Sequence, residues 1–178
     1  MNSITTDFFM HNTKLKYLSH YGEQTQQSVQ KLIEQNKLDS YLIGKYQTSH
    51  GIKNDKQLFE YTQEFKNVFM KKTAPLTKVL YDGKINIIHE ALGTHSFISR
   101  VQGGKLKTKN EIRIASMFKN MPEEFLRMIV VHELAHFKEK EHNKAFYSLC
   151  INIEPNYHQY EFDLRVYLTH LDTGSKLW

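Results

Sequence analysis

Apolar residues recur at two different spacings along the chain. Helical spacing predicts helices over residues 15–38 and 58–70. Between residues 79 and 115 apolar residues instead form short alternating runs, which predict strands with a turn at Gly103-Gly104. After residue 115 helical spacing returns, first in a helix from Pro122 and then in helices near 145–151 and 160–171. This order predicts an α+β fold with a small antiparallel sheet between two groups of helices.

The helix that begins at Pro122 is apolar on nearly every side. Proline suits a first helical position, and two glutamates follow it at the positive end of the helix dipole. The apolar positions after them are Phe125, Leu126, Met128, Ile129, Val130, Val131, Leu134 and Ala135. Such a helix is central and buried, so the polar residues within it require partners.

Those polar residues have the spacing of a metal site. His132 and His136 are four positions apart, so both can reach one metal ion from the same helix face. Glu133 can take a proton from metal-activated water, the base role that this His-Glu-x-x-His motif has in zinc peptidases. His142 would point away from the pair on a continuous helix, so we expect the helix to break near residues 138–140. Three histidines with an open position indicate one catalytic Zn²⁺ or another divalent metal ion.

Candidates for substrate binding are weaker. Five cationic residues flank the Gly-Gly turn: Arg100, Lys105, Lys107, Lys109 and Arg113. This hairpin could hold phosphates, and we expect Arg100, Lys105 and Lys107 to contact them. A solvated hairpin face is an equally good interpretation, because the spacing differs from that of a phosphate-cradling loop.

A second group of candidates follows the metal motif. Tyr157, His158 and Tyr160 lie soon after it, and one of them could stabilise an oxyanion on the substrate; packing is the alternative for both tyrosines. His158 is the candidate for substrate contact. Glu161 is a rival third ligand, because some zinc enzymes use two histidines and a glutamate.

Composition bounds the class of protein. The 178 residues suffice for one domain, expected over residues 15–178 after a short flexible N-terminus at 1–14. The single cysteine, Cys150, excludes an internal disulfide and fits a reducing compartment. With no signal peptide or membrane span in the sequence, we expect a cytoplasmic protein. A net charge of +5 permits contact with nucleic acid but does not require it.

Longer runs of the chain resemble a known family. They include residues 100–105 (Arg-Val-Gln-Gly-Gly-Lys), 111–113, 125–146 and 157–163, within a similarity that extends from Tyr17 to Leu171. The chain is similar to the YgjP-like family of bacterial metal-dependent hydrolases, which have a zincin-like metallopeptidase domain. The resemblance implies that His132, His136 and His142 bind the metal and that Glu133 is the catalytic acid and base.

Two features depart from related sequences. Many relatives carry a Trp-Gly-Ser-Cys segment before the metal helix, where this chain has Gln102 to Lys105, so no role of that Trp or Cys carries over. The metzincin pattern has glycine between the second and third histidines, where this chain has Glu139 and no evident methionine turn. Only the ligand spacing is shared with metzincins.

Three functions follow as hypotheses. The first is a zinc-dependent hydrolase acting on a peptide, which would pair with an edge strand around residues 111–115. The second, implied by the resemblance, is a nucleoside triphosphate pyrophosphatase acting on a nucleotide such as UTP. The third is a DNA-associated zinc peptidase, ranked last because no recognition-helix pattern supports it. None of the three requires a membrane, and the sequence leaves the oligomeric state open.

Overall fold

The computed structural model describes residues 15–85, 93–102 and 105–178, with the backbone alone for 93–102 and 105–109. Two units divide the chain: Met1–Gln47 with Gln159–Trp178, and Thr48–His158. The expected N-terminal segment at residues 1–14 and the Gly-Gly turn lie outside the described residues. A single domain over residues 15–178 stays a prediction.

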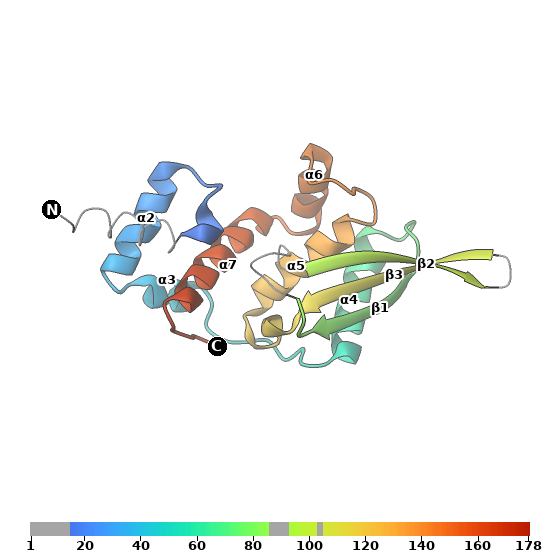
Figure 1. Ribbon diagram of the computed structural model, residues 1–178, viewed down its shortest axis with the longest axis horizontal. Helices are drawn as coiled ribbons and strands as arrows, with labels where there is room; N and C mark the ends of the chain where they lie inside the picture. Colours follow the sequence, from blue (N-terminus) through green and yellow to red (C-terminus); the bar gives the residue numbers. More distant parts are fainter. Residues whose placement is uncertain (1–14, 86–92, 103–104) are drawn as a thin grey trace. The chain divides into compact units, whose positions relative to one another are not determined.

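The first unit is helical and combines the two ends of the chain (Figure 1). It contains η1 (Lys16–Leu18), α2 (Glu23–Glu34), α3 (Leu38–Lys45) and most of α7 (Tyr157–Asp172). The prediction of one helix over residues 15–38 is wrong. Gly22 is extended (ψ 154°) immediately before α2, and Asn36 has a left-handed φ of 50° just after it. Asparagine tolerates that conformation better than most residues, and the helical path ends there.

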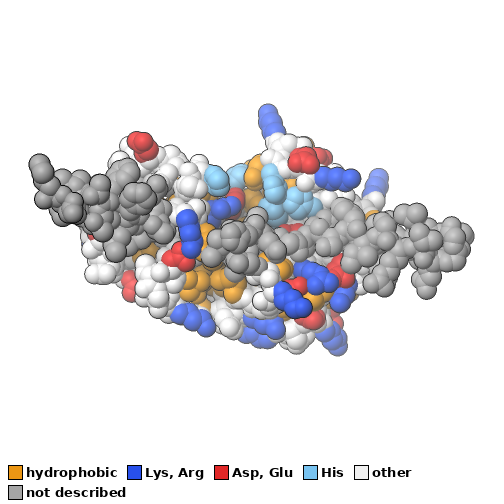
Figure 2. Space-filling model, viewed as in Figure 1, with side chains coloured by type: hydrophobic (Ala, Val, Ile, Leu, Met, Phe, Trp, Pro, Cys, Tyr) orange, Lys and Arg blue, Asp and Glu red, His pale blue; other side chains and the backbone are white. Residues whose placement is uncertain are grey.

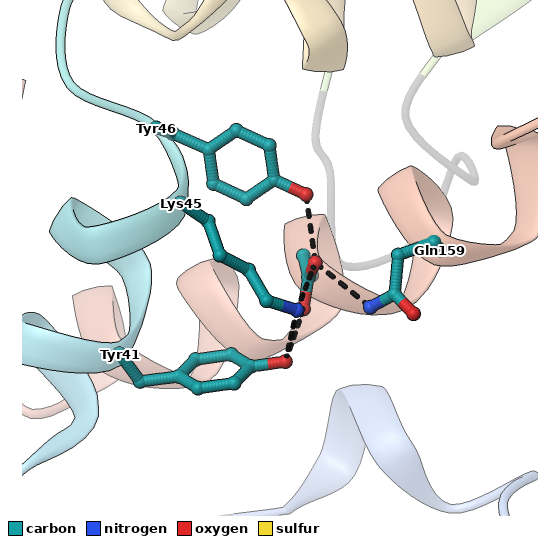
Figure 3. Close-up of polar contacts among 5 residues, drawn as sticks. Tyr41, Lys45, Tyr46 and Gln159 are labelled. Atoms are coloured by element: carbon teal, nitrogen blue, oxygen red, sulfur yellow. Dashed lines mark hydrogen bonds and ion pairs between the residues drawn. The ribbon is translucent and has the colours of Figure 1, made fainter.

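A buried carboxylate joins α3 to α7 in this unit (Figure 3). Asp163 has no exposed surface and accepts hydrogen bonds from the hydroxyls of Tyr41 and Tyr46, both at 2.7 Å. The Lys45 amine at 3.0 Å and the Gln159 amide at 2.9 Å complete the set of donors. Burial, together with the hydrogen bond to Asp163, raises the pKa of Tyr46. The hydroxyl therefore keeps the proton that it donates.

The second unit contains a mixed three-stranded sheet. Its strands are β1 (Leu76–Asp82), β2 (Gly93–Gln102) and β3 (Lys105–Ala115), in the spatial order β1-β3-β2. β3 runs antiparallel to β2 but parallel to β1, so the prediction of a wholly antiparallel sheet is wrong. The central position goes to β3, whose Ile112 and Ile114 have no exposed surface. Of residues 111–115, expected to form an edge strand, 111–114 are therefore paired on both sides and Ala115 with β1.

Helices of the same unit pack against this sheet (Figure 1). α4 (Asp55–Phe69) contacts β1, and the Asp55 carboxylate accepts a hydrogen bond from the Tyr81 backbone amide at 2.9 Å. After η2 (Ser116–Asn120), α5 (Glu123–Ala135) contacts β2 and β3. α6 (Lys144–Ile153) then packs on α5.

The prediction of a buried central helix is confirmed, because almost every residue of α5 from Phe125 to Ala135 is buried. The α+β fold class is confirmed as well. Among the helices in the described part of the chain, none has both the length and the apolar character needed to span a membrane.

Candidate metal centre

The last turn of α5 carries the first histidine and the glutamate of the motif. His132 is half-buried, whereas Glu133 is only 1% exposed. α5 ends at Ala135, and His136 is its C-cap residue with helical backbone angles. The helix therefore ends slightly before residues 138–140, where the sequence predicts the break. The extra residue of helical geometry keeps His136 one turn beyond His132, on the same face.

Two local hydrogen-bonding patterns bring the chain back to the helix face that carries His132 and His136. The amides of Lys138 and Glu139 both donate to the Ala135 carbonyl at 3.0 Å, which closes a tight turn after the helix. Four residues after Glu139, the Asn143 side chain accepts a hydrogen bond from the Phe146 amide at 2.9 Å and caps α6. Asparagine is a preferred N-cap residue, so the start of α6 is specified locally. His142 directly precedes this cap.

The three histidine rings converge on one point. The Nε2 atom of His142 lies 3.1 Å from that of His132 and 3.2 Å from that of His136. Two nitrogen ligands of a tetrahedral Zn²⁺, each at about 2.0–2.1 Å, are about 3.3–3.4 Å apart. The observed spacing is within about 0.3 Å of that value. The donor set and its geometry therefore fit one such ion, and among the described residues this is the group able to hold one.

A fully buried aromatic ring supports all three histidines. The Phe146 ring centroid lies 4.9 Å from that of His132, 4.7 Å from that of His136 and 4.8 Å from that of His142. Phe146 has no exposed surface. The cluster is accessible from solvent, since His142 is exposed, and histidine side chains reach the surface on the face shown in Figure 2. A small substrate can therefore approach from solvent.

Each half-buried histidine has a partner for its second ring nitrogen. The Nδ1 atom of His136 lies 3.0 Å from the Glu139 carbonyl oxygen, and that of His132 lies 2.7 Å from the Tyr157 hydroxyl. A carbonyl can only accept, so Nδ1 of His136 carries the proton and Nε2 keeps its lone pair. Burial lowers the pKa of His136, which favours the neutral imidazole that binds metals.

Glu133 is a buried carboxylate with an unsatisfied atom. Its Oε2 is inaccessible to solvent and has no hydrogen-bond partner in the described part of the chain. Burial raises the pKa of Glu133 to about 8. A side chain this costly to bury beside the ligands fits a group that a cation and a water molecule would satisfy.

Two further predicted site residues follow the histidine cluster in the sequence. His158 is exposed, and its ring lies 5.4 Å from those of Tyr157 and Tyr147. Glu161 pairs with Arg165 at 2.9 Å. It belongs to the first unit, so its role as a rival third ligand stays a prediction.

The structure describes only the backbone of four of the five hairpin cations, Arg100, Lys105, Lys107 and Lys109. The fifth, Arg113, pairs with Asp82 at 2.9 Å and with Glu111 at 2.7 Å. Arg100 is paired with Lys107, and Gln102 with Lys105. Since alternate residues of a strand share a face, Lys105 and Lys107 lie on the face opposite to the buried Ile112 and Ile114. β1 pairs with β3 only from Asn110 onward, so this part of the hairpin extends beyond β1 (Figure 1).

Sequence reasoning missed two residues that the structure places against the histidines. Phe146 was noted only as part of a similar run, although its position four residues after His142 is a usable signal once α6 is known to begin between them. For Tyr157 the sequence predicts packing or oxyanion binding. Nothing in the sequence indicates its contact with His132, which is 25 residues away.

Comparison with known proteins identifies the family. The YgjP-like metallopeptidase domain matches residues 16–167. A relative from Escherichia coli (strain K12), named UTP pyrophosphatase, is 54% identical over 163 residues, which cover 92% of this chain and 98% of that protein. No solved structure is a significant match. The chain therefore belongs to the YgjP-like family and is a hydrolase.

Proposed function

We propose that this hydrolase cleaves nucleoside triphosphates, with UTP as the leading substrate, to a nucleoside monophosphate and pyrophosphate. The observation that carries the substrate class is the identity of 54% to a UTP pyrophosphatase, across almost the whole of both chains. The convergence of three Nε2 atoms beside a buried glutamate supplies the matching chemistry. Hydrolysis of a phosphoanhydride needs an activated water and stabilisation of negative charge, and a metal site provides both.

His132, His136 and His142 would hold one Zn²⁺ or a related divalent ion through Nε2. When bound, the ion lowers the pKa of water and neutralises charge on the phosphate. Glu133 is the general base: it follows the first ligand directly, and its Oε2 atom has no partner within the described residues. A base with a raised pKa accepts a proton near neutral pH and can return it to the leaving group.

Exposed lysines near the histidines support an anionic substrate. Lys138, Lys140 and Lys144 are exposed on the segment between α5 and the first turn of α6, and Lys140 and Lys144 are each two positions from His142. Glu139 and Glu141 alternate with them, so the local positive charge is small. These lysines nevertheless lie within four residues of His142, whereas the hairpin cations are more distant from it in the sequence.

A peptide is the second candidate substrate, favoured by the description of the family as a metallopeptidase domain. Peptides often bind such enzymes by adding a strand to a sheet edge. Residues 111–115 offer no free edge, because β3 pairs with β1 and β2 on its two sides. β2 is an edge of the described sheet and contacts α5, so it is the strand that a peptide would extend. Neither the family description nor the relative's name refers to nucleic acid.

The test is a substrate screen of zinc-loaded protein with the Glu133→Gln variant as control. Nucleoside triphosphates and an unstructured protein are incubated separately, and the products are separated by chromatography. We expect uridine monophosphate and pyrophosphate from UTP, with turnover in the Gln variant lower by at least about a hundredfold at equal zinc content. Proteolysis without nucleotide turnover would overturn the proposal. Equal rates in the two proteins would remove Glu133 from the base role.

A further inference from the structure

The hydroxyl of Tyr157 lies 2.7 Å from Nδ1 of His132, and we propose that Tyr157 is a positioning residue of the metal centre. It would fix the His132 ring so that Nε2 faces the ion. This inference rests on the proposed function only in assuming that the three histidines hold a metal. It concerns a residue that contacts neither the ion nor the substrate.

The geometry of this contact is well defined. The rings of Tyr157 and His132 are nearly parallel, at 14°, with centroids 6.4 Å apart. The nearly parallel rings place the hydroxyl oxygen of Tyr157 within hydrogen-bond distance of Nδ1 of His132. Tyr157 has no exposed surface, so the packing around it limits movement of this oxygen.

The hydrogen bond from Nδ1 to Tyr157 determines which tautomer of His132 is stable. A neutral imidazole has one N–H, and a histidine that binds a metal through Nε2 must carry it on Nδ1. The phenol oxygen of Tyr157 can accept that N–H, which stabilises the binding tautomer of His132 and holds its ring angle. Outer partners of this kind also make the ligand more basic.

The partners of the other two histidines explain why Tyr157 matters most for His132. His136 has a main-chain acceptor, the Glu139 carbonyl, which no side-chain substitution removes. For Nδ1 of exposed His142, no partner is found among the residues that the structure describes. Of the three ligands, His132 thus has an orientation that depends on another side chain. Replacing Tyr157 should affect the metal site through this one hydrogen bond.

The experiment compares Tyr157→Phe with Tyr81→Phe in the full chain. Tyr81 donates its hydroxyl to the Ile52 carbonyl at 2.8 Å in the same unit, so Tyr81→Phe removes a hydrogen bond of similar length in which no histidine takes part. Zinc affinity is measured by competition with a chromophoric chelator. We expect Tyr157→Phe to bind zinc about 10–100-fold more weakly than the wild type, and Tyr81→Phe to be unchanged. Equal affinity in all three proteins, or an equal loss in both variants, would overturn the proposal.

A second measurement needs no variant. In zinc-loaded wild-type protein with ¹⁵N-labelled histidine, NMR should show His132 protonated at Nδ1, with a proton that exchanges slowly with water because it is bonded to a buried oxygen. A rapidly exchanging proton at this site would overturn the proposal even if Tyr157→Phe fails to fold. The proposed function fails differently: zinc binding and the Nδ1 proton would be intact, but UTP would not be hydrolysed.

Discussion

The Nε2 atoms of His132 and His142 lie 3.1 Å apart, although the two residues belong to different structural elements. His132 is in the last turn of α5, and His142 is in the connection that precedes the cap of α6. His132 is held by a buried helix, whereas His142 is exposed and held mainly by the turn around it. Replacing His142 should therefore disturb the fold less than replacing His132.

Replacing His142 should remove metal without disturbing the fold. We expect His142→Ala to weaken zinc binding by more than about a hundredfold, because losing a ligand costs more than losing an outer partner. His136→Ala should also lose metal, measured as zinc content after dialysis against a chelator. His158→Ala is the control, since His158 is exposed but outside the cluster. A His142→Ala protein that keeps zinc at wild-type affinity would exclude His142 as a ligand.

Phe146 should influence both stability and the metal site. Phe146→Ala removes a fully buried ring and should lower the free energy of unfolding by about 3–5 kcal/mol, measured by denaturant titration of metal-free protein. Phe146→Leu should fold and yet bind zinc more weakly, because the three imidazoles lose their common support. Phe125→Leu is the matched control: Phe125 is equally buried near the start of α5. If both Leu variants weaken zinc binding equally, the effect comes from a general loss of core packing and not from the contact of Phe146 with the histidines.

His50 should make the protein less stable in mild acid. Its Nε2 lies 2.7 Å from the Phe118 carbonyl, and its Nδ1 accepts from the Ile52 amide at 3.0 Å. Only a neutral ring can satisfy both contacts, and burial, with the charge of Lys53 nearby, lowers the pKa of His50. Because the folded pKa is below the ordinary value of 6.5, the unfolded chain takes up the proton first as pH falls. Stability from this residue is present above pH 6.5 and is lost as pH falls through the folded pKa.

The measurement for His50 is the denaturation midpoint of metal-free protein between pH 7.5 and about pH 5, the interval over which an ordinary histidine gains its charge. His50→Gln is the informative variant, because an amide can also donate to the Phe118 carbonyl and accept from the Ile52 amide. We expect the wild type to lose more stability than the variant across this interval. The other ionisable groups are the same in both proteins, so their contributions cancel in the difference. Parallel curves would show that His50 does not titrate differently on folding.

The Asp163 cluster should dominate the stability of the first unit. Asp163→Asn removes a fully buried charge that accepts from four donors, and we expect a loss of about 3 kcal/mol in the free energy of unfolding. Asp172→Asn is the control. Its partner is Lys16, both groups are about one third exposed, and such pairs contribute about 1 kcal/mol or less. Similar losses in the two variants would contradict the assignment of Asp163 as the buried centre of this unit.

Local patterns in the sequence predicted the elements that carry the chemistry. The continuous apolar run fixes α5 as a buried helix, and the four-residue spacing then places His132 and His136 on one face, whatever surrounds them. The spacing of His142 correctly requires the helix to end before it, because helical geometry excludes the alternative. These inferences depend only on bonds and contacts within a few turns of one segment.

Contacts between distant segments could not be predicted in the same way. β3 is central rather than an edge because β1 pairs with it in parallel, and neither strand's pattern specifies that partner. Tyr157 meets His132 only because α7 begins beside α5, and a buried tyrosine has the same pattern whether or not its hydroxyl has a function. Asp163 likewise depends on α3, more than a hundred residues away.

The last prediction concerns Arg100, Lys105 and Lys107 in the hairpin. If their side chains contact the substrate phosphates, replacing all three with alanine should raise KM for UTP at least about tenfold, since each charge-assisted hydrogen bond contributes about 1.5–3 kcal/mol. The zinc content should be unchanged, because these residues supply charge rather than coordination. A peptide substrate should be far less sensitive to the same change.

The strand pairing shows where the hairpin cations lie, and a second group of lysines provides the comparison. Arg100 and Lys107 are paired at positions beyond the end of β1, on the face opposite to the buried isoleucines of β3. The comparison is a second triple variant, with alanine at Lys138, Lys140 and Lys144, which removes the same charge beside the histidines. A rise in KM only in the hairpin variant would assign the phosphates to the hairpin. A rise only in the second variant would show that the hairpin is a solvated face and that the lysines near His142 bind the phosphates. Equal rises would indicate long-range attraction, which 0.5 M salt should abolish in both, because the screening length then falls to about 4 Å.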